Sequence, residues 1–237
     1  MPKEYMMLNT TVHKNILLKI LKDIYTDSSL GPLLGFKGGT AAYLFYELDR
    51  FSVDLDLDLL DEAKEREVFD KVENIVKRYG KIKEKTNKKH TLFVLLSYSE
   101  ESQNIKVEIN KRRFGSQYEV KNYLGVSMLV MRREDMFAHK LVAMTERGKT
   151  ANRDIFDVHF FLNHNWKMNK EIVEKRTEIK FADYLKKCVK FVKNIPDRGI
   201  LSGMGELIKE EQKDWVKSNL KQDTVFLLKL MLDSEKK

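Results

Sequence analysis

The chain has 237 residues, with 44 Lys and Arg against 36 Asp and Glu, so its formal net charge is +8 and its pI about 9.3. This length can bury a core without staples, and the single cysteine, Cys188, excludes an internal disulfide and a cysteine-rich zinc site. No stretch approaches the ~20 apolar residues of a membrane span and the first ten residues hold no apolar signal segment, so we expect a cytoplasmic protein without a membrane partner.

Two amphipathic helices are expected in the first 80 residues, with a short strand or loop between them. Residues 11–27 carry apolar side chains at helical spacing, and residues 62–79 repeat this pattern up to Gly80. Gly31-Pro32 ends the first helix, and residues 33–37 predict a short strand or an approach loop. Both helices are therefore expected to pack against a sheet.

A phosphate-binding turn is predicted after this segment. Gly38 and Gly39 allow the backbone to approach a ligand closely, and Thr40 is a suitable N-cap for a helix over residues 41–48. Backbone N–H groups at such a helix start attract phosphate. An ordinary turn is the alternative.

Acidic and apolar residues alternate over residues 53–59, which predicts a strand with one core face and one acidic face. Asp54, Asp56 and Asp58 share the acidic face, where neighbouring carboxylates are only ~7 Å apart and repel unless a cation lies between them. Oxygen ligands of this kind suit Mg²⁺ or Mn²⁺. Asp58 lies one repeat further along, and we expect a supporting role for it.

Two further strands are predicted at residues 91–98 and 105–110, joined by a polar turn. Alternation turns Glu108 outward. If its strand pairs beside the aspartate strand, Glu108 becomes a third metal carboxylate; an ordinary solvent-facing glutamate is the alternative. The apolar residues 126–130 predict an edge strand.

A helix is predicted over residues 133–147, with Lys140 and Arg147 on one shared face. A loop over residues 148–152 follows, then a helix headed by Asp154, with Asp157 on nearly the same face. We treat Lys140 as a surface lysine, so Lys140→Ala is expected to leave the fold intact.

These charged residues admit two interpretations. Surface ion pairs, Lys140 with Asp154 and Arg153 with Asp157, would each contribute at most ~1 kcal/mol. A lysine on a triphosphate, with an acid that orients it or activates an acceptor, is what an acidic metal site would still need. We favour the second interpretation.

The remainder of the chain, from residue 167, is Lys-rich with helical periodicity, interrupted near Pro196 and Gly203. Its pattern predicts a helical C-terminal region. The histidines show no paired metal-ligand spacing, and we expect all of them at the surface or the edge of the core: His13, His90, His139, His159 and His164.

The stretch GGTAAYLFYELDRFSVDLDLDL resembles the nucleotidyltransferase core of the AbiEii/AbiGii toxin family, a branch of the polymerase-beta-like superfamily. The family signature is Gly-Gly-Thr-Ala, a helix, then Arg-x-Ser-x-Asp-hydrophobic-Asp, and a distal Lys, Arg and Arg-Asp-x-x-Asp follow. The resemblance covers residues 33–163. The residues that match these motifs in order are Arg50, Ser52, Asp54, Asp56, Lys140, Arg147, Arg153, Asp154 and Asp157.

The resemblance implies an α+β fold, with a polymerase-beta-like core of mixed sheet and helices at residues 1–165 and a helical region at residues 166–237. It implies that Asp54, Asp56 and Glu108 bind Mg²⁺ (or Mn²⁺), and that Asp54, Asp56, Lys140 and Asp157 take part in catalysis. The nucleoside triphosphate would be bound by Gly38, Gly39, Thr40, Arg50, Ser52, Lys140, Arg147, Arg153 and Asp154.

The family also implies a biological role. Its members are typically toxins of toxin–antitoxin or phage-abortive systems, and some add nucleotides to the tRNA 3′ end. We therefore expect transfer of a nucleotide from an NTP to RNA, most naturally tRNA, and a cognate antitoxin as partner; the basic charge agrees with RNA. A protein or small-molecule acceptor, and an inactive nucleotidyltransferase fold acting as a binding or antitoxin module, are the alternatives.

Overall fold

The computed structural model describes residues 9–100, 103–146 and 152–235. These residues form two compact units. The first comprises the described parts of 1–47, 51–113 and 118–131, and the second those of 48–50, 114–117 and 132–237. The sequence-based division at residue 165 stays a proposal about the extent of the nucleotidyltransferase core.

The first unit is built on a mixed sheet, so the α+β class is confirmed. In the part of the chain that is described, seven strands follow the order β3-β4-β5-β2-β1-β7-β6. Strand β2 is antiparallel to β1 and parallel to β5, and β1 is parallel to β7. The strands are β1 (Leu34–Lys37), β2 (Leu55–Leu59), β3 (Lys81–Lys88), β4 (Thr91–Ser97), β5 (Ile105–Asn110), β6 (Tyr118–Tyr123) and β7 (Val126–Met131).

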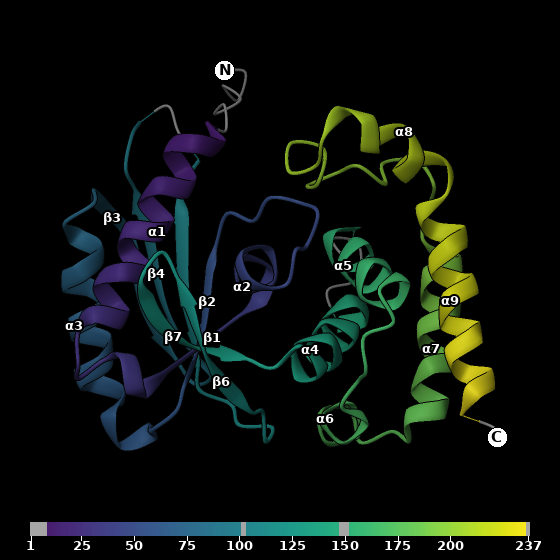
Figure 1. Ribbon diagram of the computed structural model, residues 1–237, viewed down its shortest axis with the longest axis horizontal. Helices are drawn as coiled ribbons and strands as arrows, with labels where there is room; N and C mark the ends of the chain where they lie inside the picture. The colour runs from purple at the N-terminus through teal and green to yellow at the C-terminus, as the bar shows by residue number, and fades with distance from the viewer. Residues whose placement is uncertain (1–8, 101–102, 147–151, 236–237) are drawn as a thin grey trace. The chain divides into compact units, whose positions relative to one another are not determined.

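Helices cover both faces of this sheet (Figure 1). Helices α1 (Thr10–Thr26) and α3 (Glu65–Lys77) lie on one face, and α2 (Gly38–Phe45) lies on the other. The short helices η1 (Gly31–Leu33) and η2 (Glu62–Lys64) connect strands and helices. The core beneath α1 is mainly apolar. Helix α1 contributes Leu17, Ile20, Leu21 and Ile24, and the strands contribute Leu34, Phe36, Leu55 and Leu57.

The start of α2 differs from the sequence prediction. The helix begins at Gly38, directly after β1, and its N-cap residue is Lys37. Thr40 is therefore inside the helix and not its N-cap. Its hydroxyl is buried and donates to the backbone oxygen of Asp54 instead. The hydroxyl expected to cap the helix therefore makes a tertiary contact.

The two edges of the sheet were not predicted correctly. Residues 126–130 form β7, which lies between β1 and β6 and is not an edge. The edge strands β3 and β6 were missed because an edge strand has a neighbour on one side only, so it needs little apolar alternation and tolerates charge. Strand β3, with sequence KIKEKTNK, is mostly exposed.

The second unit is helical. Helix α9 packs against α5 and α7, and α4 packs against α5 and α6; Figure 1 shows α7 beside α9. No helix among the described residues is long and apolar enough to cross a membrane. The helices are α4 (Arg133–Glu146), α5 (Asn152–Asn163), α6 (Lys170–Thr177), α7 (Phe181–Asn194), α8 (Glu210–Ser218) and α9 (Leu220–Ser234).

Candidate active site

The centre of the sheet in the first unit carries three acidic residues, Asp54, Asp56 and Glu108, which we call the acidic row. Asp56 of β2 pairs laterally with Glu108 of β5 in parallel register, so the two carboxylates emerge on one face of adjacent strands. The strand of Glu108 therefore pairs beside the aspartate strand, which is the condition for Glu108 as a third metal carboxylate. Asp54 lies just before β2, and its side chain is 21% exposed. The three acids thus lie directly before β2, on β2 and on its neighbour β5.

The fit of these acids to a metal ion depends on their donor chemistry and their placement. Across residues 9–100, 103–146 and 152–235, no three His, Cys, Asp or Glu side chains converge closely enough to hold a metal. The backbone nevertheless places Asp56 and Glu108 as direct neighbours, and all three groups are hard oxygen donors, which suit Mg²⁺ or Mn²⁺. Glu108 is exposed and Asp54 and Asp56 are partly exposed, so these oxygen donors fit the ion by their chemistry.

The N-terminus of α2 lies against the acidic row. Gly38 adopts φ +77°, and a Cβ atom at this position would come within 2.2 Å of Asp56 Oδ2. Gly38 is therefore required both for its backbone conformation and for its lack of a side chain. The backbone N–H groups that begin α2 and the carboxylate of Asp56 are brought together by this one close approach.

The backbone leading to β2 is held by side chains from two helices. Thr40 of α2 donates to the Asp54 carbonyl, and Nε2 of His13 on α1 lies 2.9 Å from the Val53 carbonyl. Because a carbonyl only accepts, Nε2 carries the proton and Nδ1 accepts from the Tyr98 hydroxyl at 2.9 Å. These contacts order the segment that carries Asp54, and Ser52 is buried beside it.

The expectation that His13 lies at the surface or the edge of the core was wrong. The side chain is fully buried, and burial lowers its pKa although the hydrogen bond to Val53 opposes this shift. A signal was present in the sequence, because His13 lies four residues before Leu17 and so extends the apolar stripe of α1. Its polar atoms are satisfied only by residues far away in the chain.

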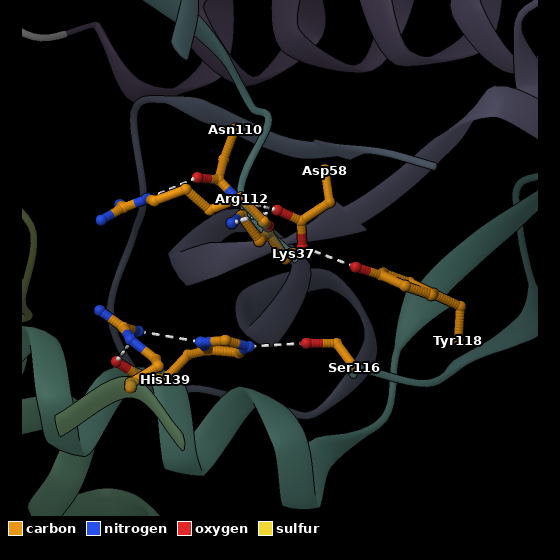
Figure 2. Close-up of polar contacts among 8 residues, drawn as sticks. Lys37, Asp58, Asn110, Arg112, Ser116, Tyr118 and His139 are labelled. Carbon is orange, nitrogen blue, oxygen red and sulfur yellow. Dashed lines mark hydrogen bonds and ion pairs between the residues drawn. The ribbon is translucent and has the colours of Figure 1, made fainter. Parts of the chain in front are cut away.

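Asp58 has a different environment from the other two aspartates (Figure 2). Lys37 Nζ and Asn110 Nδ2 each lie 2.6 Å from Oδ1, and the Tyr118 hydroxyl lies 2.6 Å from Oδ2. Burial would raise the pKa of Asp58, but the charge of Lys37 and the three hydrogen bonds outweigh it and lower the pKa. This carboxylate is occupied by protein donors.

In the second unit, a buried ion-pair cluster joins the distal motif to Arg50. The guanidinium of Arg50 binds Asp157 through two hydrogen bonds, of 2.5 and 2.7 Å. Lys140 Nζ lies 2.9 Å from Asp154 and 3.0 Å from Asp157. Four residues of the two predicted motifs are therefore assembled in one place.

The surface position expected for Lys140 was wrong, since its side chain is only 12% exposed. Helix α5 packs against α4 and covers this residue. Burial would lower the pKa of Lys140, but Asp154 and Asp157 raise it. Likewise, burial would raise the pKa of Asp157, and the charges of Arg50 and Lys140 lower it. Both groups are thus held in their charged forms.

The distal motif also includes Asp154, Arg153 and Arg147. Helix α5 begins at Asn152, so Asp154 lies in its first turn and does not head the helix. Arg153 is half-buried. One interpretation of the sequence paired Arg153 with Asp157, but Arg50 and Lys140 bind that carboxylate. Arg147 and the loop at 148–151 lie outside the described residues.

The chain matches a known protein family. The family model described as "Nucleotidyl transferase AbiEii toxin, Type IV TA system" matches residues 19–224. No sequence among the curated proteins matches the chain.

Two crystal structures from Helicobacter pylori share the fold. One, of a protein described as a candidate nucleotidyltransferase, has a TM-score of 0.63 and 21% identity, over 95% of this chain and 96% of that one. The other, JHP933, has a TM-score of 0.55 and 22% identity, over 97% and 98%. At this level of identity the similarity establishes the fold alone.

Proposed function

Because this chain belongs to the AbiEii nucleotidyl transferase toxins of type IV toxin–antitoxin systems, we propose that it transfers a nucleotide from an NTP to RNA, with the tRNA 3′ end as acceptor. The observation that carries this proposal is the close approach of the α2 N-terminus to an acidic row. Gly38 touches Asp56, and Asp56 is paired with Glu108. The proposed phosphate-binding turn and the proposed metal ligands are therefore close together.

The acids have the role of holding Mg²⁺ or Mn²⁺. Asp54, Asp56 and Glu108 would hold the ions, which would lower the pKa of the attacking hydroxyl and stabilise the departing pyrophosphate. The backbone N–H groups at Gly38 and Gly39 would bind phosphate oxygens. Thr40 serves this site by fixing the Asp54 backbone, through the hydroxyl contact described above, and buried Ser52 belongs to the same segment.

The cluster of the second unit has the role of supplying positive charge for the triphosphate. Lys140 is the central group, and Asp154 and Asp157 orient its ammonium. We assign Asp157 a positioning role because it is fully buried and both of its cationic partners keep it ionised. Arg50, Arg153 and Arg147 complete the proposed set of nucleotide-binding residues.

In the reaction, the acceptor hydroxyl oxygen forms a bond to the α-phosphorus, and the bond from that phosphorus to its leaving oxygen breaks. Pyrophosphate leaves, and the hydroxyl proton passes to solvent. Hydrogen bonds from His13 and Thr40 hold the segment before β2 and keep the Asp54 backbone in place. Such preorganisation lowers the cost of assembling the charged transition state. The net charge of +8 supports an RNA acceptor, and a cognate antitoxin is the proposed protein partner.

The test is transfer of label from each α-labelled NTP to total cellular RNA in the presence of Mg²⁺. Wild-type protein should label an RNA species of tRNA size. Asp56→Asn should reduce this transfer by at least about a hundredfold, because it removes a charged metal ligand. Asp70→Asn is the matched control, since Asp70 is exposed on α3, and it should transfer as wild type does.

The outcomes separate the alternatives. Label on protein or on a small molecule would keep the chemistry and reject RNA as acceptor. Equal transfer by wild type and Asp56→Asn would reject the assignment of the acidic row. Neither transfer nor metal-dependent nucleotide binding, in wild-type protein that is folded, would indicate an inactive binding module.

A further inference from the structure

The further inference concerns Lys37, the residue between β1 and α2. Its Cα is paired with that of Asp56 in the antiparallel register of β1 and β2. Since Asp56 is in turn paired with Glu108, the three side chains form a single row on one face of the sheet, with strands about 4.8 Å apart. A lysine therefore stands beside two acids in the proposed site.

The ammonium of Lys37 is held by a preformed acceptor. Asp58 is only 6% exposed and receives three donors, from Lys37, Asn110 and Tyr118. Both oxygens of Asp58 accept hydrogen bonds from protein groups, and Lys37 offsets its charge, so this carboxylate needs no metal ion. It acts as an anion that fixes the lysine.

Two of those three donors are themselves held in place, and Figure 2 shows the contact of one of them, Asn110, with Arg112. Asn110 accepts from Arg112 Nε at 3.2 Å and donates to the Arg112 carbonyl at 2.9 Å. The ring of Tyr118 lies over Gly35, where a Cβ atom would come within 2.2 Å of it. Two neutral side chains, Asn110 and Tyr118, thus fix the position of Asp58, and Asp58 in turn binds the ammonium of Lys37.

A phosphate-bearing ligand at the start of α2 would meet this cation. Lys37 immediately precedes Gly38, the first residue of α2, and its side chain is 20% exposed. An ammonium has three N–H donors, of which Asp58 Oδ1 takes one. Charge-assisted hydrogen bonds to phosphate are among the stronger ones available to a protein.

We propose that Lys37 is a further substrate-binding residue that contacts the triphosphate of the incoming nucleotide, and that Asp58 is its positioning residue. This inference rests on the proposed function, because it places the triphosphate at the N-terminus of α2. It also separates the three aspartates by role: Asp54 and Asp56 face the metal ions, and Asp58 serves the lysine.

The test compares nucleotide binding by wild type and Lys37→Met, measured by calorimetry with a non-hydrolysable NTP analogue and with the corresponding NMP. Methionine keeps the unbranched apolar chain and removes the charge. The variant should bind the triphosphate at least about tenfold more weakly, since a charge-assisted hydrogen bond is lost. NMP affinity should change much less, and Mn²⁺ binding without nucleotide, followed by electron paramagnetic resonance, should persist.

Lys64→Met is the matched control, because Lys64 forms an exposed ion pair with Glu67 in the same unit; its NTP affinity should equal that of wild type. Asp58→Asn keeps the size of the side chain and releases the ammonium, so it should raise the KM for NTP more than it lowers kcat. This second variant decides the matter if Lys37→Met does not fold.

The inference would be overturned by wild-type NTP affinity in folded Lys37→Met, or by equal losses of NTP and NMP affinity, which would indicate a purely structural ion pair. An unchanged KM in Asp58→Asn would reject the positioning role. Failure of the wild type to bind any NTP is a different result, because it rejects the proposed function itself.

Discussion

Gly38 shows how a single residue determines the geometry of the site. Its φ of +77° is a conformation that glycine adopts readily and other residues do not, and a Cβ atom here would come within 2.2 Å of Asp56 Oδ2. Backbone conformation and lack of a side chain are therefore both required at the point where α2 meets the acidic row.

Gly38→Ala should consequently affect stability and activity together. A left-handed conformation costs a non-glycine residue about 1–2 kcal/mol, and the methyl group would in addition displace Asp56. Gly125→Ala is the matched control, because Gly125 has φ +80° with no heavy atom within 4 Å of the added carbon. Urea unfolding should show a larger loss for Gly38→Ala, and label transfer should fall in that variant alone; equal losses of stability would show that crowding against Asp56 is unimportant.

At the scale of elements, the packing of α4 against α5 buries charged side chains, and the stability of this packing depends on their ion pairs. Asp157 is fully buried between Arg50 and Lys140. Such an arrangement is tolerated because each carboxylate has cationic partners at hydrogen-bond distance, whereas removal of one partner leaves an uncompensated charge. This unit should therefore be sensitive to substitutions that a surface ion pair would tolerate.

Asp157→Asn should lower the free energy of unfolding by about 3–5 kcal/mol at pH 7, because two buried cations lose their counter-ion. The folded-state pKa of Asp157 is lowered, so its stabilising contribution is present above the unfolded value of about 3.9 and is lost as the pH falls through the folded value. The difference between wild type and variant should be constant from pH 7 to about pH 4 and shrink below it.

Urea unfolding between pH 7 and pH 3 measures this difference, with Asp70→Asn as the exposed control. A loss below about 1 kcal/mol at pH 7 would match a solvent-exposed pair and contradict the buried network. Lys140→Met should also destabilise the protein, in contrast to the expectation from the sequence.

At the scale of the whole molecule, charge is distributed unevenly along the chain. The acids of the proposed site lie in the first unit, and most of the net charge of +8 falls in the second unit, which contains the Lys-rich C-terminal helices. A polyanionic acceptor would gain affinity from this excess by releasing the cations bound to its phosphates.

Label transfer to RNA should accordingly weaken steeply between about 50 and 200 mM salt, because each phosphate contact contributes to the salt dependence. Affinity for the NTP analogue, measured over the same range, should decrease less, since the NTP carries fewer phosphates. Equal salt dependence for both ligands would indicate that the basic excess does not contact the acceptor.

Local patterns in the sequence were sufficient for much of this protein. Alternation in residues 53–59 and 105–110 predicted two strands and which residues share a face of each. The motif around Gly38 predicted the family, because periodicity and short motifs are properties of neighbouring residues. The Gly-Gly-Thr segment was also identified correctly as the start of a helix, although with a boundary three residues too late.

Only the tertiary structure decided the partners of these residues. The parallel register that sets Asp56 beside Glu108, the burial of His13 and Lys140, and the three donors to Asp58 all join segments far apart in the chain. A sequence pattern specifies which way a side chain faces on its own strand or helix. Whether that face meets solvent, a cation or another helix depends on which element packs against it, and this is determined by the fold as a whole.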